Sequence, residues 1–478
     1  MKKLSLILAL TLTLLCFSGC KKQGGELSVH YEINLEFFEN NVAVANQTVT
    51  VYNCETKPLS SLYFTLYPLA FSKSASEKPC FDSEINSVFY NGESYGDINI
   101  KTLKINGENA SFEIEDITLK TALTSPLEVG KKLEVYFEYE LILPSANHRF
   151  GYGENTVNLT GFYPVLCVLD SGEFYKNSYA QTGDPFYSYS SNFALNLTLP
   201  STYVLAPSLK VESVVWQGEK TTYNMVREKA RDIAVILSKN YSVAKKKVGE
   251  IEVTYYYFND ANFTKTLETA CDCLEYYINS ISPYPYLEYA VCQADFYCGG
   301  MEYSGLSLIS SSERLNPTYV IAHETAHQWW HSKVGFNESE IAFLDEGLTE
   351  LATANYLNYA GIASYESTLK NALSSYALLR KELIENGVTT PPIMVRNLKS
   401  FSCSAEYVAV VYNRSFIALS ELKKQMGDKK FARLLTKFST DFAFKNATLN
   451  NFVDCANKIK RKSGKVIEDY AYFKNAIK

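Results

Sequence analysis

Alternating apolar and polar positions mark several segments in the first half of the chain. Residues 131–143 carry an apolar side chain at every second position, namely Leu133, Val135, Phe137, Tyr139 and Leu141. This period of two is typical of a strand with one buried face, and residues 191–199 and 250–258 repeat it. Several strands without helical patterns between them predict an antiparallel β-sandwich or saddle, which we place at residues 27–248.

The apolar period lengthens to that of helices in the second half of the chain. Residues 262–281 present one apolar helical face, which ends before two prolines. Asn316 and Pro317 supply an N-cap and a first helical residue for a helix expected to reach about residue 332. Further helices are predicted near residues 343–359, 363–386, 404–426, 428–440 and 448–461. We therefore expect an α+β protein, with a mainly helical second domain at residues 249–478.

The composition is that of a large globular protein. A chain of 478 residues exceeds one ordinary hydrophobic core, so two or three domains are expected. The apolar content of 46% argues against disorder. Acidic residues outnumber basic ones, the formal net charge is -6, and no long basic run is present. Nucleic acid is therefore not an expected partner.

The first residues have the pattern of an export signal. Met1-Lys2-Lys3 is positively charged, residues 4–17 are apolar, and Ser18-Gly19-Cys20 follows. The end of this segment resembles a bacterial lipobox, which implies that residues 1–19 are a signal peptide and that Cys20 is lipidated. Residues 20–26 would then be a short polar tether. We expect a lipoprotein of the bacterial cell envelope that faces outward from the cytoplasmic membrane; an uncleaved anchor and plain secretion remain the alternatives.

The most informative motif is His323-Glu324-Thr325-Ala326-His327, in a chain with only five histidines. Residues four apart share one face of a helix, so His323 and His327 can supply the first two ligands of a tetrahedral zinc ion. Glu324 is then placed to act as general base toward a water molecule at the metal. The alternative, two solvated histidines beside a surface glutamate, is disfavoured by the apolar residues that surround the motif.

A third protein ligand is expected from another element, and Glu346 has a suitable position. Eighteen residues separate it from His327, and it lies near the start of the next predicted helix. Glu350, one turn later, is the competing carboxylate, and Asp345 is expected to orient a histidine. Two histidines and one glutamate leave one position for water, which is typical of a catalytic site with one Zn²⁺ per chain.

His331 continues the histidine series by one more helical turn. Three ligands on one straight helix would not converge on a single ion. We therefore expect His331 either to support the metal ligands from outside or to lie at the surface.

Residues 323–330 (HETAHQWW) and the later LDEGLTE segment resemble the aminopeptidase N family of gluzincin metallopeptidases. The family's Gly-x-Met-Glu-Asn motif has a counterpart in Gly299-Gly300-Met301-Glu302-Tyr303, with Tyr303 in place of Asn. The resemblance implies that this backbone is an edge strand that pairs with a peptide substrate, and that Glu302 binds the free α-amine. A carboxylate beside the metal can fix an ammonium group and so set the register of cleavage.

The family also uses a tyrosine to stabilise the oxyanion, often within Tyr-Glu-Lys-Gly. Tyr412-Asn413-Arg414-Ser415 lies in the equivalent stretch and keeps the tyrosine and a basic third residue. A phenol is a good donor to an oxyanion that develops in the transition state. Tyr407 is the rival for this role, five residues earlier.

By this resemblance, the second domain is a thermolysin-like zincin catalytic domain. The implied activity is hydrolysis of N-terminal peptide bonds by metal-activated water, with peptides as substrates. The chain ends soon after the catalytic helices, so the resemblance is to a truncated bacterial lipoprotein form with a more open cleft. A thermolysin-like endopeptidase and a non-catalytic peptide-binding lipoprotein are the alternative functions.

Overall fold

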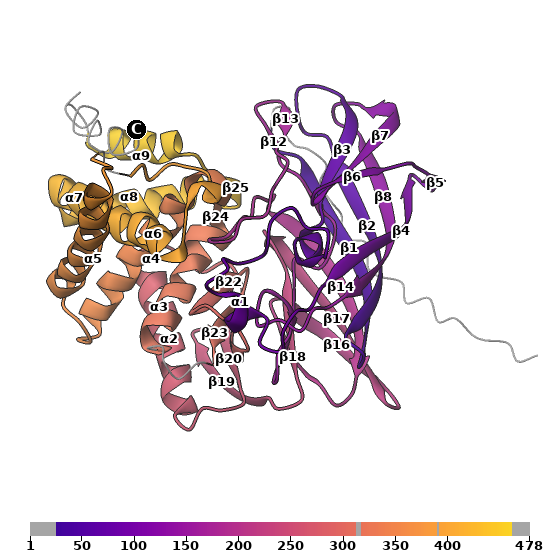
Figure 1. The fold of residues 1–478 in the computed structure, drawn as a ribbon, viewed down its shortest axis with the longest axis horizontal. Helices are drawn as coiled ribbons and strands as arrows, with labels where there is room; N and C mark the ends of the chain where they lie inside the picture. The colour runs from indigo at the N-terminus through magenta and orange to yellow at the C-terminus, as the bar shows by residue number, and fades with distance from the viewer. Residues whose placement is uncertain (1–24, 312–316, 390–391, 461–478) are drawn as a thin grey trace, which may run out of the picture.

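The structure is a computed structural model that describes residues 25–311, 317–389 and 392–460. The predicted signal peptide, most of the tether, the lipidation site Cys20 and the N-cap Asn316 lie outside these ranges, so those predictions remain predictions. Figure 1 shows a β lobe built from the first half of the chain and a lobe rich in helices built from the second half. The predicted α+β fold class is therefore confirmed.

The largest sheet of the β lobe has eight strands. Along β8 (Lys132–Ile142) buried and more exposed side chains alternate, as the sequence period predicts. All neighbouring strands are antiparallel except β1 and β14, which run parallel, so the prediction of a purely antiparallel domain is wrong at this pair. The strand order is β16 (Lys210–Gln217), β17 (Lys220–Ala230), β14 (Ser191–Pro200), β1 (Ser28–Phe38), β2 (Val42–Tyr52), β8, β4 (Asp97–Ile105) and β5 (Glu108–Asn109).

Two four-stranded sheets share an apolar core with the large sheet. Phe64 and Phe137 meet in this core with ring centroids 5.0 Å apart. One sheet has the order β15 (Val204–Pro207), β18 (Ala234–Ser238), β10 (Val157–Thr160) and β9 (Phe150–Tyr152). The other has the order β11 (Val165–Leu166), β3 (Leu59–Thr65), β7 (Thr118–Leu127) and β6 (Glu113–Glu115). A short hairpin joins β12 (Leu169–Asp170) to β13 (Glu173–Phe174).

A five-stranded sheet begins the second lobe. Its order is β19 (Ser242–Val248), β20 (Ile251–Tyr257), β21 (Glu288–Ala294), β23 (Leu306–Ser310) and β22 (Gly300–Tyr303). The predicted division after residue 248 falls within the β19–β20 hairpin, so this sheet starts a few residues before the predicted second domain. Strand β22, which carries the glycine-rich motif, is an edge strand of the sheet.

Helices lie on the side of this sheet that faces away from the β lobe and form the rest of the second lobe (Figure 1). Helix α4 begins five residues before the predicted start at 343, with the acidic residues Glu338 and Glu340 in its first turn, where they favour a helix N-terminus. A short helix α1 (Ile85–Val88) lies in the β lobe, and the long helices are α2 (Phe263–Ser280), α3 (Pro317–His327), α4 (Glu338–Tyr359), α5 (Tyr365–Glu385), α8 (Asp428–Asp441) and α9 (Leu449–Lys460).

Two π-helical turns interrupt the predicted helices. The first, at Gln328–Lys333, directly follows α3. The second, at Val408–Arg414, separates α6 (Ser404–Tyr407) from α7 (Ser415–Met426), so the single helix predicted at 404–426 is three consecutive segments. Such turns occur frequently at functional sites; the first of these carries His331 and the second carries Tyr412. The strands β24 (Val334–Gly335) and β25 (Lys445–Asn446) then pair in parallel beside the first turn.

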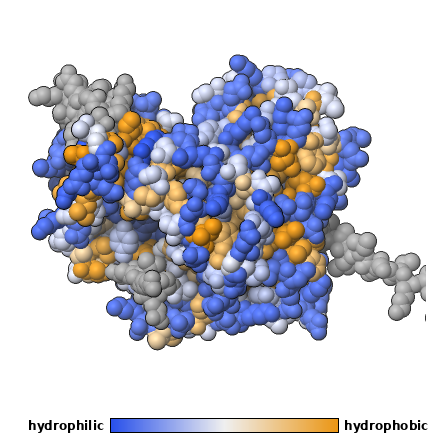
Figure 2. Space-filling model, in the orientation of Figure 1, coloured by the Kyte–Doolittle hydropathy of each residue, from blue (hydrophilic) through white to orange (hydrophobic). Residues whose placement is uncertain are grey.

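Hydrophilic positions dominate the face shown in Figure 2, and the hydrophobic ones form small, separate groups. Most large apolar side chains lie instead in two cores, one inside the β lobe and one beneath the helices. Across the described part of the chain, no helix combines the length and apolar character needed to cross a membrane.

Candidate metal centre and active site

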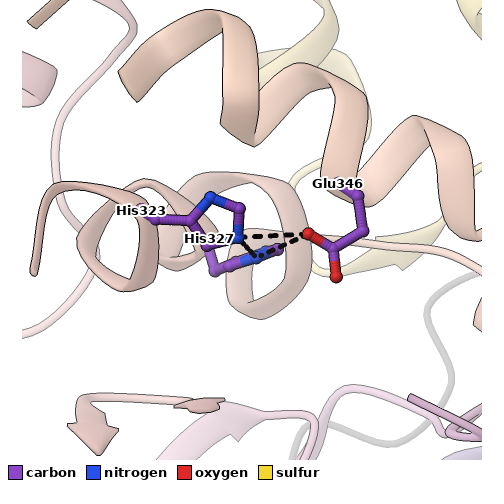
Figure 3. A group of neighbouring side chains, drawn as sticks. All are labelled: His323, His327 and Glu346. Carbon is purple, nitrogen blue, oxygen red and sulfur yellow. Dashed lines mark hydrogen bonds and ion pairs between the residues drawn. The ribbon is translucent and has the colours of Figure 1, made fainter. Parts of the chain in front are cut away.

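Helices α3 and α4 bring together the three predicted metal ligands (Figure 3). Nε2 of His323 lies 3.1 Å from Nε2 of His327 and 3.1 Å from Oε2 of Glu346. Nε2 of His327 lies 3.4 Å from the same carboxylate oxygen. All three side chains are buried, so these donor atoms form a compact triangle inside the protein.

This triangle fits a zinc ion. Ligands at about 2.0 Å from a tetrahedral ion are about 3.3 Å from one another, close to the three distances between these donor atoms. Two imidazole nitrogens that face each other at 3.1 Å also need either a shared proton or a cation between them. The donor set of two nitrogens and one carboxylate oxygen is one that zinc accepts in catalytic sites, where a fourth position remains open. His323, His327 and Glu346 therefore fit a zinc ion and would hold it.

Neighbouring groups orient both histidines. Oδ1 of Asp345 lies 2.8 Å from Nδ1 of His327, as predicted for a residue that orients a ligand. Oε1 of Glu350 lies 2.9 Å from Nδ1 of His323 and accepts a hydrogen bond from the Tyr319 hydroxyl. Glu350, the competing ligand, therefore lies on the side of the His323 ring that faces away from His327 and Glu346.

Without a metal ion, the three predicted ligands together bind a proton strongly. Burial lowers the pKa of His323, but its contacts with Glu346 and Glu350 outweigh this and raise the pKa to about 10. Burial raises the pKa of Glu346, but hydrogen bonds from the two histidines outweigh it and leave this pKa well below its usual range. Binding of a metal ion must displace the proton from His323, so the affinity for metal falls as pH falls.

The Glu324 side chain lies between the metal ligands and strand β22. It is 5% exposed, and its Oε2 has no hydrogen-bond partner among the described residues. A Cβ atom placed on Gly300 would lie 2.6 Å from Cδ of Glu324, so the carboxylate occupies the space that a larger residue at 300 would need. Burial raises the pKa of Glu324 to about 7, and the two histidines partly offset this effect. A carboxyl group with this pKa can accept and return a proton near neutral pH.

Strand β22 places the glycine-rich motif at the sheet edge. Its residues pair with β23 on one side, with Gly300 opposite Ile309 and Glu302 opposite Ser307. The carbonyl of Gly299 accepts a hydrogen bond from the Ser310 amide, which extends this pairing. Met301 is buried, and its sulfur accepts a hydrogen bond from Nε of Arg149 in the β lobe.

Glu302 projects from this strand into the interior. Its carboxylate is 3% exposed, and Oε1 has no hydrogen-bond partner in the described structure. One of its oxygens lies within 4.8 Å of donor atoms of both Glu324 and His327. The adjacent Tyr303 is buried, and its carbonyl accepts a hydrogen bond from Gln328, so the replacement of Asn leaves β22 tied to the π-helical turn after α3. Glu302 is therefore a buried carboxylate beside the metal centre.

Tyr412 reaches the metal centre from the second π-helical turn. Its hydroxyl donates a hydrogen bond of 2.6 Å to Oε1 of Glu346, and its ring stacks on His323 with centroids 5.5 Å apart. Burial and the nearby Glu346 carboxylate raise the pKa of Tyr412 well above its usual value, so it remains a proton donor. The rival Tyr407 is buried, its hydroxyl has no described partner, and it contacts Tyr412 only through its ring.

His331 lies in a second polar cluster behind the metal centre. It is 2% exposed, so the surface position considered for it is wrong. Its Nδ1 lies 2.7 Å from Oε1 of Glu338, and its Nε2 lies 2.8 Å from Oδ2 of Asp232. Sequence reasoning missed both carboxylates. Asp232 lies between two strands of the β lobe, 99 residues from His331, and only the acidic first turn of α4 could have drawn attention to Glu338.

Comparison with known proteins agrees with this geometry. A family model described as the peptidase family M1 domain matches residues 265–470. The chain is 25% identical to endoplasmic reticulum aminopeptidase 2 of Bos taurus over 385 residues, which cover 71% of this chain and 39% of that protein. It is 22% identical to aminopeptidase N of Lactococcus lactis subsp. lactis over 417 residues, which cover 78% and 46%. The chain thus spans less than half the length of these curated relatives.

The fold also matches solved structures over nearly its whole length. An M1 zinc metallopeptidase from Deinococcus radiodurans superposes with a TM-score of 0.66 at 16% identity, covering 96% of this chain and 95% of that one. A mutant of an M1 zinc metallopeptidase from the same organism, bound to a Tyr-Ser-Ala substrate, superposes with a TM-score of 0.62 over 91% and 93%. At this identity the likeness establishes the fold. Residues 265–470, which carry the metal triangle, therefore match the peptidase family M1 domain, and the chain is similar to aminopeptidase N and shares the fold of an M1 zinc metallopeptidase.

Proposed function

We propose that this protein is a zinc-dependent aminopeptidase, which hydrolyses the N-terminal peptide bond of peptides with a free α-amine. The observation that carries the proposal is the position of Glu302. This carboxylate is buried on an edge strand, has an oxygen without a described hydrogen-bond partner, and lies within 4.8 Å of donor atoms of Glu324 and His327. A buried carboxyl oxygen without a hydrogen bond is costly, and the ammonium group of a peptide would satisfy it.

The proposed register follows from the spacing along β22. A peptide that pairs with the free edge of this strand would run beside the metal centre. One extended residue spans about 3.5 Å, which is comparable with the separation between Glu302 and the groups around the metal. An ammonium held by Glu302 therefore leaves room for one residue before the scissile bond.

Glu324 is the proposed general base. Bound zinc at this site supplies Lewis acidity, which lowers the pKa of water and polarises a carbonyl group. Glu324 takes the proton of the attacking water and passes it to the leaving amine, a cycle suited to its pKa of about 7. The missing side chain of Gly300 leaves the space that the Glu324 carboxylate occupies beside strand β22.

Tyr412 is the proposed donor to the oxyanion. Before substrate binds, its hydroxyl donates to Oε1 of Glu346. A tetrahedral oxyanion near the metal would offer a stronger acceptor, because its negative charge develops only in the transition state. The raised pKa of Tyr412 keeps the proton available for this hydrogen bond.

Two other functions remain as outcomes of the test. A thermolysin-like endopeptidase would use the same zinc ligands and Glu324, but it would not require an ammonium at Glu302. A non-catalytic peptide-binding lipoprotein would not require Glu324 as a base. The buried and unpaired oxygens of both carboxylates favour the aminopeptidase.

For the location, we propose a lipid anchor at Cys20 that holds the enzyme at the outer face of a bacterial cytoplasmic membrane. The charged start, the apolar segment and Ser18-Gly19-Cys20 support this proposal. A Cys20→Ser variant is expected to leave the membrane fraction and to lose incorporation of labelled fatty acid. Full membrane retention of this variant would contradict the proposal.

The test of the activity uses the tripeptide Tyr-Ser-Ala, which one structural neighbour binds as a substrate, with and without N-acetylation. We expect release of free tyrosine from the unmodified peptide, no comparable cleavage of the acetylated one, and loss of activity with a zinc chelator that added zinc restores. Equal cleavage of both peptides would support an endopeptidase. No cleavage of either by zinc-loaded protein would support a binding protein.

A further inference from the structure

One helical turn beyond His327, four buried side chains form a second cluster of metal-binding types. They are Glu302, His331, Glu338 and Asp345, and each can offer one donor atom such that all four atoms lie within 4.8 Å of one another. None is more than 3% exposed. Only Glu302 belongs to the substrate site proposed above, so the grouping of the other three needs its own explanation.

Asp232 fixes the orientation of the His331 ring from the side opposite the cluster. Oδ2 of Asp232 lies 2.8 Å from its Nε2, and this contact holds the ring so that Nδ1 points into the cluster. Nδ1 then lies 2.7 Å from Oε1 of Glu338 and 3.8 Å from Oε1 of Glu302. A carboxylate behind a histidine whose other nitrogen faces further acidic groups is the arrangement found around metal-binding histidines.

Two oxygens in the cluster have unmet bonding capacity. Oε2 of Glu338 and Oε1 of Glu302 are buried and have no hydrogen-bond partner in the described structure. Three carboxyl groups of the cluster, those of Glu302, Glu338 and Asp345, lie around one imidazole. A buried carboxyl oxygen without a hydrogen bond is costly, and an ammonium at Glu302 would not satisfy Oε2 of Glu338.

We propose that Glu302, His331 and Glu338, with Asp345 as a fourth donor, bind a second divalent cation beside the catalytic zinc. One imidazole nitrogen with several carboxylate oxygens suits zinc or manganese. Ligands on opposite sides of an ion, each about 2.2 Å from it, lie about 4.4 Å apart, which agrees with the 4.8 Å limit on the donor atoms. The near-complete burial of His331, Glu338 and Asp345 favours an ion over a substrate side chain at these three residues.

The second cation would control access to the amine site. This consequence rests on the proposed function, because it requires Glu302 to be the carboxylate that holds the substrate ammonium. A cation that shares Glu302 competes with that ammonium and weakens the binding of free-amine peptides. Asp345 connects the two metal sites, since its Oδ1 lies 2.8 Å from Nδ1 of the zinc ligand His327.

The test is the metal content of the purified full-length protein after equilibrium dialysis against Zn²⁺ and, separately, Mn²⁺. We expect two ions per wild-type chain in saturating Zn²⁺, and one in Glu338→Gln and in His331→Gln. The control Glu366→Gln removes an exposed carboxylate of α5 and is expected to keep two ions. One ion in the wild type, or two in both cluster variants, would overturn the proposal.

Two readouts keep this test decisive. Far-ultraviolet circular dichroism verifies the fold of each variant, and either cluster variant alone suffices if the other fails to fold. In the wild type, the KM for Tyr-Ser-Ala is expected to rise about tenfold as zinc increases from one to two equivalents, the size of one lost charge-assisted hydrogen bond; Glu338→Gln is expected to show no such rise. Two bound ions with an unchanged KM would contradict the proposal that the second cation and the substrate ammonium share Glu302. Absence of any hydrolysis would instead refute the proposed function, and the number of bound ions would still test the second metal site.

Discussion

The hydroxyl of Tyr412 donates a 2.6 Å hydrogen bond to Oε1 of Glu346, the carboxylate whose other oxygen faces both metal-binding histidines. The phenol thereby reaches the zinc centre from a π-helical turn that lies 66 residues further along the chain. This relationship places a neutral hydrogen-bond donor beside the three metal-binding side chains.

Removal of that donor should slow the chemical step. For Tyr412→Phe we expect kcat to fall by about 10²–10³-fold, the usual effect of losing one oxyanion donor, while the zinc content remains that of the wild type. The matched control is Tyr407→Phe, which removes a buried hydroxyl without a described partner and should leave kcat within a few-fold of the wild type. Steady-state kinetics with metal analysis distinguish the two tyrosines, and equal losses in both variants would contradict the assignment.

The pH dependence should report Glu324. Burial raises the pKa of this carboxyl to about 7, and below that pH it is protonated and cannot accept a proton. We therefore expect kcat/KM to rise with pH along an acid limb whose midpoint is no higher than about 7, because the charge of bound zinc lowers the pKa. In Glu324→Gln the rate should fall by about 10²–10⁴-fold, and the residual activity should lack this limb. An unchanged limb in the variant would exclude Glu324 as the titrating base.

The zinc ligands could be predicted because they depend on local spacing. His323 and His327 share a helical face by their separation alone, and Glu346 needed only a second helix near the first. Helix periodicity also gave the right extents for α2, α5 and α8 to within a few residues. In each case the information lies within one or two consecutive elements.

Gly300 should be required for activity more than for folding. A Cβ atom there would lie 2.6 Å from Cδ of Glu324 and would push the end of that side chain away. Because a displacement of about 1 Å can reduce a rate by about 10²-fold, we expect a loss of that order in Gly300→Ala with little change in melting temperature. Gly299→Ala is the control, since its Cβ would meet Val320 at an ordinary 3.7 Å. Similar kcat/KM values for the two variants would show that the Glu324 contact is unimportant.

Asp345 should affect zinc affinity rather than the protein fold. Its Oδ1 lies 2.8 Å from Nδ1 of His327 and fixes which nitrogen of that ring faces the metal. Loss of such a partner typically weakens metal binding by about 10–100-fold, so Asp345→Asn is expected to release zinc at correspondingly lower chelator concentrations. The measurement is competition with a chromophoric chelator, and a wild-type zinc affinity in this variant would contradict the role.

Other parts of the site could not be predicted because they depend on distant segments. Asp232 meets His331 across 99 residues and comes from a different lobe, so no local pattern joins them. The π-helical turn that carries Tyr412 lies inside what reads as one continuous helix from 404 to 426, and the sequence pattern contains no signal for its widened hydrogen bonding. The parallel pairing of β1 with β14 could not be predicted either, because the 152 residues between these strands do not indicate which strands pair.

The central claim is that Glu302 selects free N-termini, and the ratio of activities on Tyr-Ser-Ala and its N-acetylated form tests it most directly. For Glu302→Gln we expect kcat/KM for the free peptide to fall by about 10–100-fold, as for loss of a hydrogen bond to a charged group. The much lower value for the acetylated peptide should not change, so the preference should largely disappear. A Glu302→Gln enzyme that retains zinc and the full wild-type preference for the free amine would contradict the account.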